Sequence, residues 1–196
     1  MQHPPVQPPS KSDASVGHPN VAEGHVVVSQ PSFARLWRQA IFIPILHNRW
    51  LTETVMQRLT QQVGKAEKGH RGEVFLVIEN HLPIHQAYRV GSRERAIDLF
   101  SNYRVWDTEE NTGVLVYVNI CEHSLEIVAD RGINAHVSPT VWRAMCDKAL
   151  AGMAKGKMEQ SLTDLLAEIG LLLRRHYYLE DDPAGNELSD TVVFLR

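Results

Sequence analysis

The most constraining feature of the sequence is a pair of short apolar runs joined by a polar connection. VLVYVNI at 114–120 is rich in β-branched residues and too short for an isolated helix, so it predicts a strand buried on both faces. LEIVAD at 125–130 alternates between apolar and mixed positions, which predicts a strand with one wetter face. The connection at 121–124 is too short for a crossover, so we predict an antiparallel hairpin.

This hairpin should bring two polar loops together. In an antiparallel pair the start of the first strand lies beside the end of the second, so Gly113 and Asp130 should be neighbours. The acidic loop 107–110 and the sequence Asp-Arg-Gly at 130–132 then meet at one end of the sheet. Carboxylate and amide oxygens are ligands for hard cations, and arginine binds phosphate. The hairpin end can therefore hold a divalent cation or a phosphate.

The same residues also have a purely structural interpretation. Asp107, Thr108 and Asn111 can satisfy backbone groups of their own loop. Asp130 and Arg131 would then form an exposed ion pair. The residues by themselves leave both interpretations open.

Two strings in this region resemble a known family. RVWDTE at 104–109 and EIVADRGI at 126–133 are closely similar to strings in the short bacterial branch of the TPM domain family. The resemblance extends from about Arg35 to the NEL at 186–188. It implies an α/β sandwich. Relatives are associated with acid phosphatase activity, with calcium binding, or with assembly or repair of membrane complexes.

The remaining apolar patterns predict the elements around the hairpin. They predict a first helix over 51–66, capped by Thr52 or Thr54, and three further helices that begin at Ser92, at Ser138-Pro139 and at about Met158. They also predict a strand over 73–79, a short extended segment at 85–90, and an edge strand or loose end at 191–195. This order of elements favours an α/β sandwich with a mixed central sheet and helices on its faces.

The length of 196 residues suits one domain with tails. We expect a disordered proline-rich tail over 1–31, the α/β domain over 32–178 and a C-terminal tail over 179–196. We recognise neither a signal peptide nor a spanning segment, so we expect a cytoplasmic protein that is at most peripheral to a membrane.

An amphipathic segment at 32–50 opens the domain. Its apolar residues recur at helical spacing: Phe33, Leu36, Trp37, Ala40 and Ile41. With Arg35 and Arg38 among them, the segment can lie on an anionic membrane surface or pack on the domain with its arginines in water. So few basic residues attract a membrane weakly, which favours packing.

The sequence lacks the motifs of several common kinds of functional site. The net charge of −3 gives no general case for a nucleic-acid partner. The sequence contains no glycine-rich phosphate loop, no nucleophile elbow and no HExxH motif. His81 and His85 have metal-ligand spacing only on a helix, which Pro83 between them disfavours. Cys121 and Cys146 lie in apolar patterns typical of buried free thiols.

Metal-assisted chemistry therefore remains. We hypothesise a calcium or magnesium site whose ligands are Asp107, Glu109, Asn111 and Asp130. A small phosphate ester is the candidate substrate, with Asp130 and either Arg131 or Arg104 as the catalytic groups. The alternative is a non-catalytic interaction or assembly module that binds a protein partner at a membrane surface.

Overall fold

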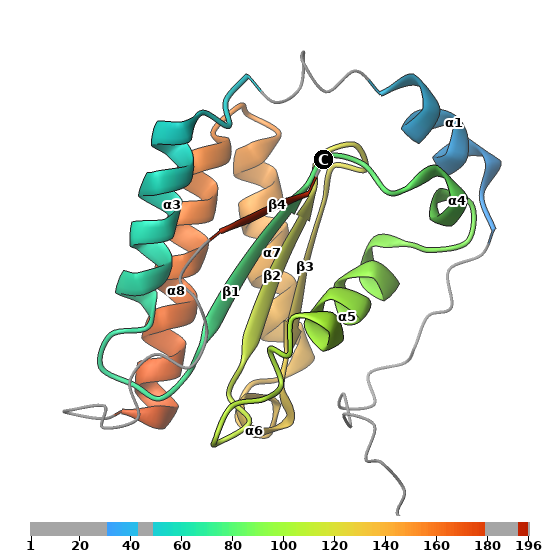
Figure 1. Ribbon diagram of the computed structural model, residues 1–196. Helices are drawn as coiled ribbons and strands as arrows, with labels where there is room; N and C mark the ends of the chain where they lie inside the picture. The colour runs from blue at the N-terminus through green and yellow to red at the C-terminus, as the bar shows by residue number, and fades with distance from the viewer. Residues whose placement is uncertain (1–30, 43–48, 179–191, 196) are drawn as a thin grey trace, which may run out of the picture.

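A four-stranded mixed sheet forms the centre of the protein (Figure 1). The structure, a computed structural model, describes residues 31–42, 49–178 and 192–195. The elements are α1 (Phe33–Ile41), α3 (Glu53–Ala66), β1 (Val74–Glu79), α4 (Ile84–Ala87), α5 (Ser92–Asn102), β2 (Val114–Asn119), β3 (Ser124–Ala129), α6 (Arg131–Asn134), α7 (Pro139–Met153), α8 (Met158–Tyr177) and β4 (Val193–Leu195). Helices α3, α7 and α8 cover one face of the sheet and α5 covers the other, which confirms the predicted α/β sandwich. Residues 1–30 and 179–191, which contain most of the two predicted tails, lie outside the described residues.

The predicted hairpin is confirmed. Strands β2 and β3 pair antiparallel, with Val114 opposite Ala129 and Asn119 opposite Ser124. The Asp130 N–H donates to the carbonyl oxygen of Gly113 at 2.9 Å, so these two residues are neighbours as expected. The end of β3 therefore returns to the loop that precedes β2.

The sheet continues through parallel pairs, in the order β3-β2-β1-β4. Strand β1 runs parallel to β2 on one side and to β4 on the other, where Val77 pairs with Val193. Within the predicted range 191–195, Val193–Leu195 thus forms an edge strand. Because parallel neighbours need crossover connections, α5 joins β1 to β2 over one face, and α7 and α8 lie on the opposite face between β3 and β4.

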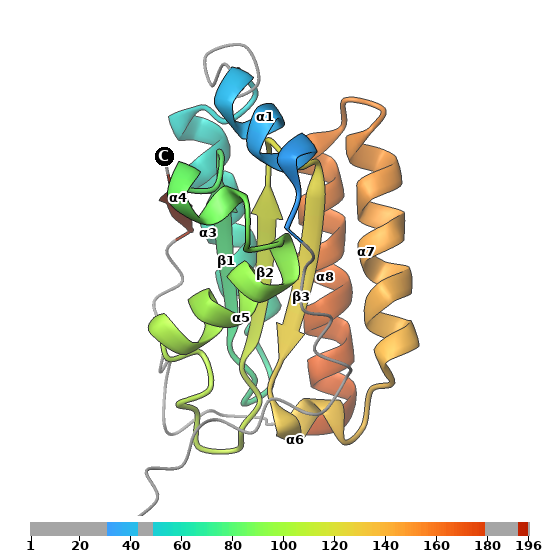
Figure 2. The ribbon, with the colours of Figure 1, turned by 90° about the vertical axis from the view of Figure 1, so that its right-hand side faces the viewer.

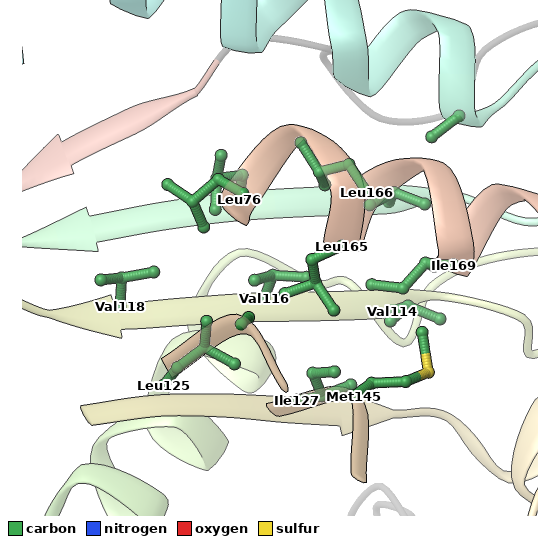
Figure 3. Close-up of a cluster of buried hydrophobic side chains, with 14 of the residues drawn as sticks. Leu76, Val114, Val116, Val118, Leu125, Ile127, Met145, Leu165, Leu166 and Ile169 are labelled. Atoms are coloured by element: carbon green, nitrogen blue, oxygen red, sulfur yellow. The ribbon is translucent and has the colours of Figure 1, made fainter. Parts of the chain in front are cut away.

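The larger core lies between the sheet and the layer of α3, α7 and α8 (Figure 3). Alternate residues of the strands, such as Leu76, Val116 and Ile127, face the apolar side of α8. Leu165 and Ile169 of α8 are among the fully or nearly fully buried residues of this cluster. The helix predicted from about Met158 is therefore confirmed as α8, and its buried residues recur at the i, i+3, i+4 spacing of one helix face.

A smaller core beneath α5 surrounds a buried polar network. The Arg95 guanidinium lies 2.7 Å from Glu79, whose other carboxylate oxygen accepts the Tyr117 hydroxyl at 2.5 Å. Asn119 donates to the same hydroxyl oxygen at 2.9 Å. Burial and the Glu79 charge raise the pKa of Tyr117, so its hydroxyl stays protonated as a donor. The network fixes α5 against the carboxyl ends of β1 and β2.

The expected extended segment at 85–90 is wrong, because the chain forms the short helix α4 there. Pro83 is the N-cap of α4, and its carbonyl oxygen accepts the N–H groups of Gln86 and Ala87 at 2.8 and 2.9 Å. Proline is well tolerated at the start of a helix because its missing N–H has no helical partner there. The proline therefore starts a turn of helix where we expected a strand.

Helix α1 packs on the domain, as expected, but with its apolar side outward. Gln39 is buried, whereas Phe33, Trp37 and Ile41 are exposed. The Leu82 N–H donates to the Gln39 side-chain oxygen at 2.9 Å. A buried backbone N–H needs an acceptor, and the polar side of α1 supplies it. The expectation that α1 would bury its apolar side is therefore wrong.

The network beneath α5 gives a stability prediction with a matched control. Arg95→Met should lower the free energy of unfolding by about 3–5 kcal/mol, because it leaves the buried Glu79 carboxylate without its cation. Arg58→Met breaks a similar two-contact pair with Glu159, but that pair is exposed, so stability should hardly change. Urea denaturation compares the two variants, and equal losses would contradict the role assigned to the network.

Candidate functional site

The open end of the β2–β3 hairpin is closed by backbone contacts from the loop at 107–113. Besides the Asp130–Gly113 contact, the Gly132 N–H donates to the Asn111 carbonyl oxygen at 2.9 Å. Asp130 is also the N-cap of α6, a helix that we did not predict. Figure 2 shows α6 at the end of the sheet opposite α1. The predicted meeting of the two polar loops is therefore observed.

Glycine at position 132 permits an unusually close approach of these loops. A Cβ atom there would lie 2.5 Å from the carbonyl oxygens of both Glu110 and Asn111. Asn111 has a positive φ of 57°, a conformation that asparagine adopts more readily than most residues. Two backbone oxygens are consequently brought beside the β3–α6 junction.

Asp130 is the central side chain of this junction. It is 6% exposed, and its Oδ1 accepts the Arg131 N–H at 2.6 Å. Its Oδ2 is buried and has no hydrogen-bond partner among the described residues. Burial raises the pKa of the Asp130 carboxyl, while the Arg131 N–H and the Arg131 charge act in the opposite direction. A buried carboxylate oxygen without a partner is costly, so this atom is suited to a cationic ligand.

Arg131 follows Asp130 and lies at the protein surface. Its Nε donates to the Asn111 side-chain oxygen at 3.1 Å, and the residue itself is exposed. The structural interpretation of Asp130 and Arg131 as an exposed ion pair is wrong for Asp130, because that carboxylate is buried. The structure thus brings together Asn111, Asp130 and Arg131 from the predicted site residues.

The acidic loop has other partners. Asp107 lies 3.8 Å from Arg104 in an exposed pair, and Glu110 pairs with Arg71. Glu109 is exposed. Within residues 31–42, 49–178 and 192–195, no three histidine, cysteine, aspartate or glutamate side chains form a group that could hold a metal ion. A cation at this end would therefore depend on Asp130 together with backbone, amide or water oxygens.

Part of the loop follows the structural interpretation. The Thr112 N–H donates to Thr108 Oγ1 at 2.9 Å, and Thr112 Oγ1 donates to the Arg71 carbonyl oxygen at 3.0 Å. Thr108 therefore satisfies a backbone group, as that interpretation expects. These contacts hold the loop against the segment that enters β1.

Sequence reasoning missed several neighbours of the site. Arg71 comes from the segment before β1, and its N–H donates to the Tyr177 carbonyl oxygen at 3.3 Å. Burial, with a contribution from the Glu110 charge, raises the pKa of Tyr177. His136 and His176 stack with ring centroids 5.2 Å apart. These residues come from distant parts of the sequence, and no local motif indicates that they meet.

The cysteines are unsuited to nucleophilic catalysis. Burial raises the pKa of Cys121 to about 11 and that of Cys146 to about 12, with neighbouring carboxylates adding to both shifts. Both are free thiols. Because the thiolate is the nucleophile, the raised pKa values favour the less reactive thiol form of both side chains near neutral pH.

Comparison with known proteins decides the family. A family model described as TPM domain matches residues 47–171. The chain belongs to the TPM domain family. The matched range includes the whole hairpin, the loop that precedes it and the Asp130–Gly132 junction, so the candidate site is part of this chain's TPM domain.

A solved structure supports the family assignment. The NMR structure of the BA42 protein from the psychrophilic bacterium Bizionia argentinensis is similar to this TPM domain, with a TM-score of 0.64 and 26% sequence identity. The similarity covers 73% of this chain and 94% of the BA42 chain. Comparison with curated proteins gives no significant match. Among the residues that the structure describes, no helix combines the length and apolar character needed to cross a bilayer.

The raised pKa of Asp130 predicts how stability depends on pH in the absence of cations. The native state binds a proton at Asp130 more tightly than the unfolded chain does, so protonation stabilises the native state as the pH falls through the raised pKa. Asp130→Asn removes the buried charge and keeps an N-cap acceptor. With chelator present, this variant should be at least as stable as the parent at neutral pH. As the pH falls, the free energy of unfolding of the parent should rise relative to that of the variant.

The control is Asp130→Ala, which removes the N-cap and should cost about 1 kcal/mol. Urea denaturation across a pH series measures all three proteins. An Asn variant as unstable as the Ala variant at neutral pH would contradict the burial cost assigned to the carboxylate.

Proposed function

We propose that this TPM domain binds a divalent cation, calcium or magnesium, at the open end of the β2–β3 hairpin. The observation that carries the proposal is the buried Oδ2 of Asp130, which has no partner among the described residues. An anionic oxygen held in this way is stabilised by a cation more than by water, because the charge is partly desolvated. Asp130 is thus the proposed anionic ligand.

Neighbouring oxygens can complete a ligand set. The carbonyl oxygens of Glu110 and Asn111 lie beside Gly132, which is two residues after Asp130 in the chain. Calcium takes 6–8 oxygen ligands, which include backbone carbonyls and waters, whereas magnesium retains several waters. With a single buried carboxylate, we expect affinity near the weak end of protein calcium sites, on the order of 10⁻⁴–10⁻³ M.

Asp107 and Glu109 have a smaller part in this proposal than the sequence suggested. Asp107 already pairs with Arg104, and the side chains of Asp107 and Glu109 are exposed. For Asp107 and Glu109 to act as ligands, the loop at 104–110 would have to rearrange around the cation. We therefore assign them a role in attracting cations to the site and assign direct ligation first to Asp130.

Weak hydrolysis of small phosphate esters is the activity that we propose for the site. A bound cation would neutralise phosphate charge and lower the pKa of a coordinated water. Arg131 is exposed beside Asn111, where its guanidinium can bind phosphate oxygens. Arg104 is also exposed, but its pairing with Asp107 makes it the second candidate for that role.

Cation binding can be tested against a matched aspartate. Asp130→Asn should weaken calcium binding at least tenfold, because it removes the buried anionic ligand. Asp164→Asn makes the same chemical change at an exposed position of α8 and should leave binding unchanged. Isothermal titration calorimetry measures both variants. Equal affinities, or no binding by the parent at millimolar calcium or magnesium, would remove the proposed site.

Phosphatase activity is a separate test. The parent should hydrolyse p-nitrophenyl phosphate slowly in the presence of magnesium, and chelator should abolish the turnover. Asp130→Asn should abolish it as well, whereas Arg131→Ala should reduce it mainly through a higher KM because it removes a phosphate-binding group. Turnover that persists in a folded Asp130→Asn protein would contradict the assignment, even if that site binds cations.

A further inference from the structure

Helix α1 exposes a continuous apolar face. Phe33, Trp37 and Ile41 are 75%, 69% and 57% exposed, and they follow one another at intervals of four residues. Side chains at i and i+4 lie on the same side of a helix. The three large exposed apolar side chains of α1 therefore form one stripe on the surface, and at its first residue the Phe33 ring also contacts the Tyr88 ring, with centroids 4.9 Å apart.

The domain fixes this orientation through polar contacts. Gln39, on the inner side, is 2% exposed and accepts the Leu82 N–H at 2.9 Å. The Arg38 guanidinium lies 3.2 Å from Glu122 in the β2–β3 turn, and the Ser32 N–H donates to the Tyr88 carbonyl oxygen at 3.1 Å. Because these contacts lie on the polar side of α1, its apolar stripe stays outward in the folded domain.

The surface around α1 is basic, although the chain as a whole is acidic. Residues 31–42 and 81–91, which contain α1 and α4, hold three arginines, two histidines and no aspartate or glutamate. Arg38, His85 and Arg89 of these segments are exposed. Glu122 is an acidic neighbour that contacts Arg38 and Gln39, and its side chain is only 12% exposed. The net charge of the whole chain is −3, so the positive charge of these segments differs in sign from that of the chain as a whole.

These features favour a lipid surface over a second copy of the chain. A stable protein–protein interface buries about 800 Å² on each partner, which exceeds what three side chains on a nine-residue helix can supply. Phenylalanine and tryptophan on one side of a helix with basic neighbours are typical of helices that lie in a membrane interface. The basic surroundings complement anionic headgroups.

We propose that α1, with the basic residues of α1 and α4, is a docking surface for an anionic lipid bilayer. The stripe of Phe33, Trp37 and Ile41 enters the headgroup region, while Arg89 and His85 face the anionic headgroups. The polar contacts of Gln39 keep the helix attached to the domain during docking. This inference is independent of the cation site.

Docking through α1 also sets the orientation of the domain. Helix α1 contacts the β2–β3 turn at Glu122, whereas Asp130 lies at the other end of β3 (Figure 2). A six-residue strand spans about 20 Å, so the two ends are well separated. The candidate cation site therefore faces solution when α1 lies on a bilayer.

Flotation of the full chain with vesicles tests the proposal. The parent should bind vesicles of equimolar phosphatidylcholine and phosphatidylglycerol, and it should bind phosphatidylcholine vesicles less. Trp37→Ser should lower binding about tenfold or more, because it removes a large apolar side chain from the interface. Arg89→Gln should lower binding to the anionic vesicles about fivefold.

Leu171→Ser is the matched control, because Leu171 is another large exposed apolar residue, 64% exposed, and lies on α8. It should bind vesicles like the parent. Both serine variants change exposed positions and should keep the parent's melting temperature. Absence of parent binding, equal losses in the two serine variants, or equal binding to both vesicle types would overturn the proposal. A dimer that Trp37→Ser dissociates, without any vesicle binding by the parent, would assign the stripe to a second copy instead.

Discussion

Every residue of β1 and β2 is buried, and the rest of the structure depends on this constraint. A strand pair buried on both faces needs an apolar layer on each side, which α5 supplies on one face and α3, α7 and α8 supply on the other. The polar side chains of Glu79, Tyr117 and Asn119 in these two strands bond to one another and to Arg95 of α5, so the network satisfies its members internally. With both faces closed, the polar chemistry of the domain is left to the two ends of the strands.

The two ends have different characters. At one end, Gly132 lets the carbonyl oxygens of Glu110 and Asn111 lie close to the β3–α6 junction, whose first residue is the buried Asp130. At the other end, α1 is attached through Gln39 and exposes an apolar stripe within a basic surface. The proposed cation site and the proposed lipid-docking surface thus lie at opposite ends of one sheet. A TPM domain arranged in this way can be held at a membrane surface without covering its candidate site.

The sequence predicted the elements whose signal is local and periodic. The β-branched run at 114–120 and the apolar stripe of α8 indicated buried elements, because burial on a strand or helix imposes a period on the sequence. Periodicity could not show whether an apolar face is covered, so the orientation of α1 was predicted wrongly. Sequence proximity also could not show which carboxylates meet. Asp107 and Glu110 pair with Arg104 and Arg71, and Arg71 reaches the site only because β1 lies beside β2.

We propose that Asp130 and the carbonyl oxygens beside Gly132 form a cation site. A calcium titration followed by amide chemical shifts tests it most directly, because it locates binding residue by residue. We expect progressive shifts at Glu110, Asn111 and the Asp130–Gly132 junction, in the millimolar range or below, and no such shifts in Asp130→Asn. Shifts confined to other parts of the domain, or identical shifts in the parent and the Asp130→Asn variant, would contradict it.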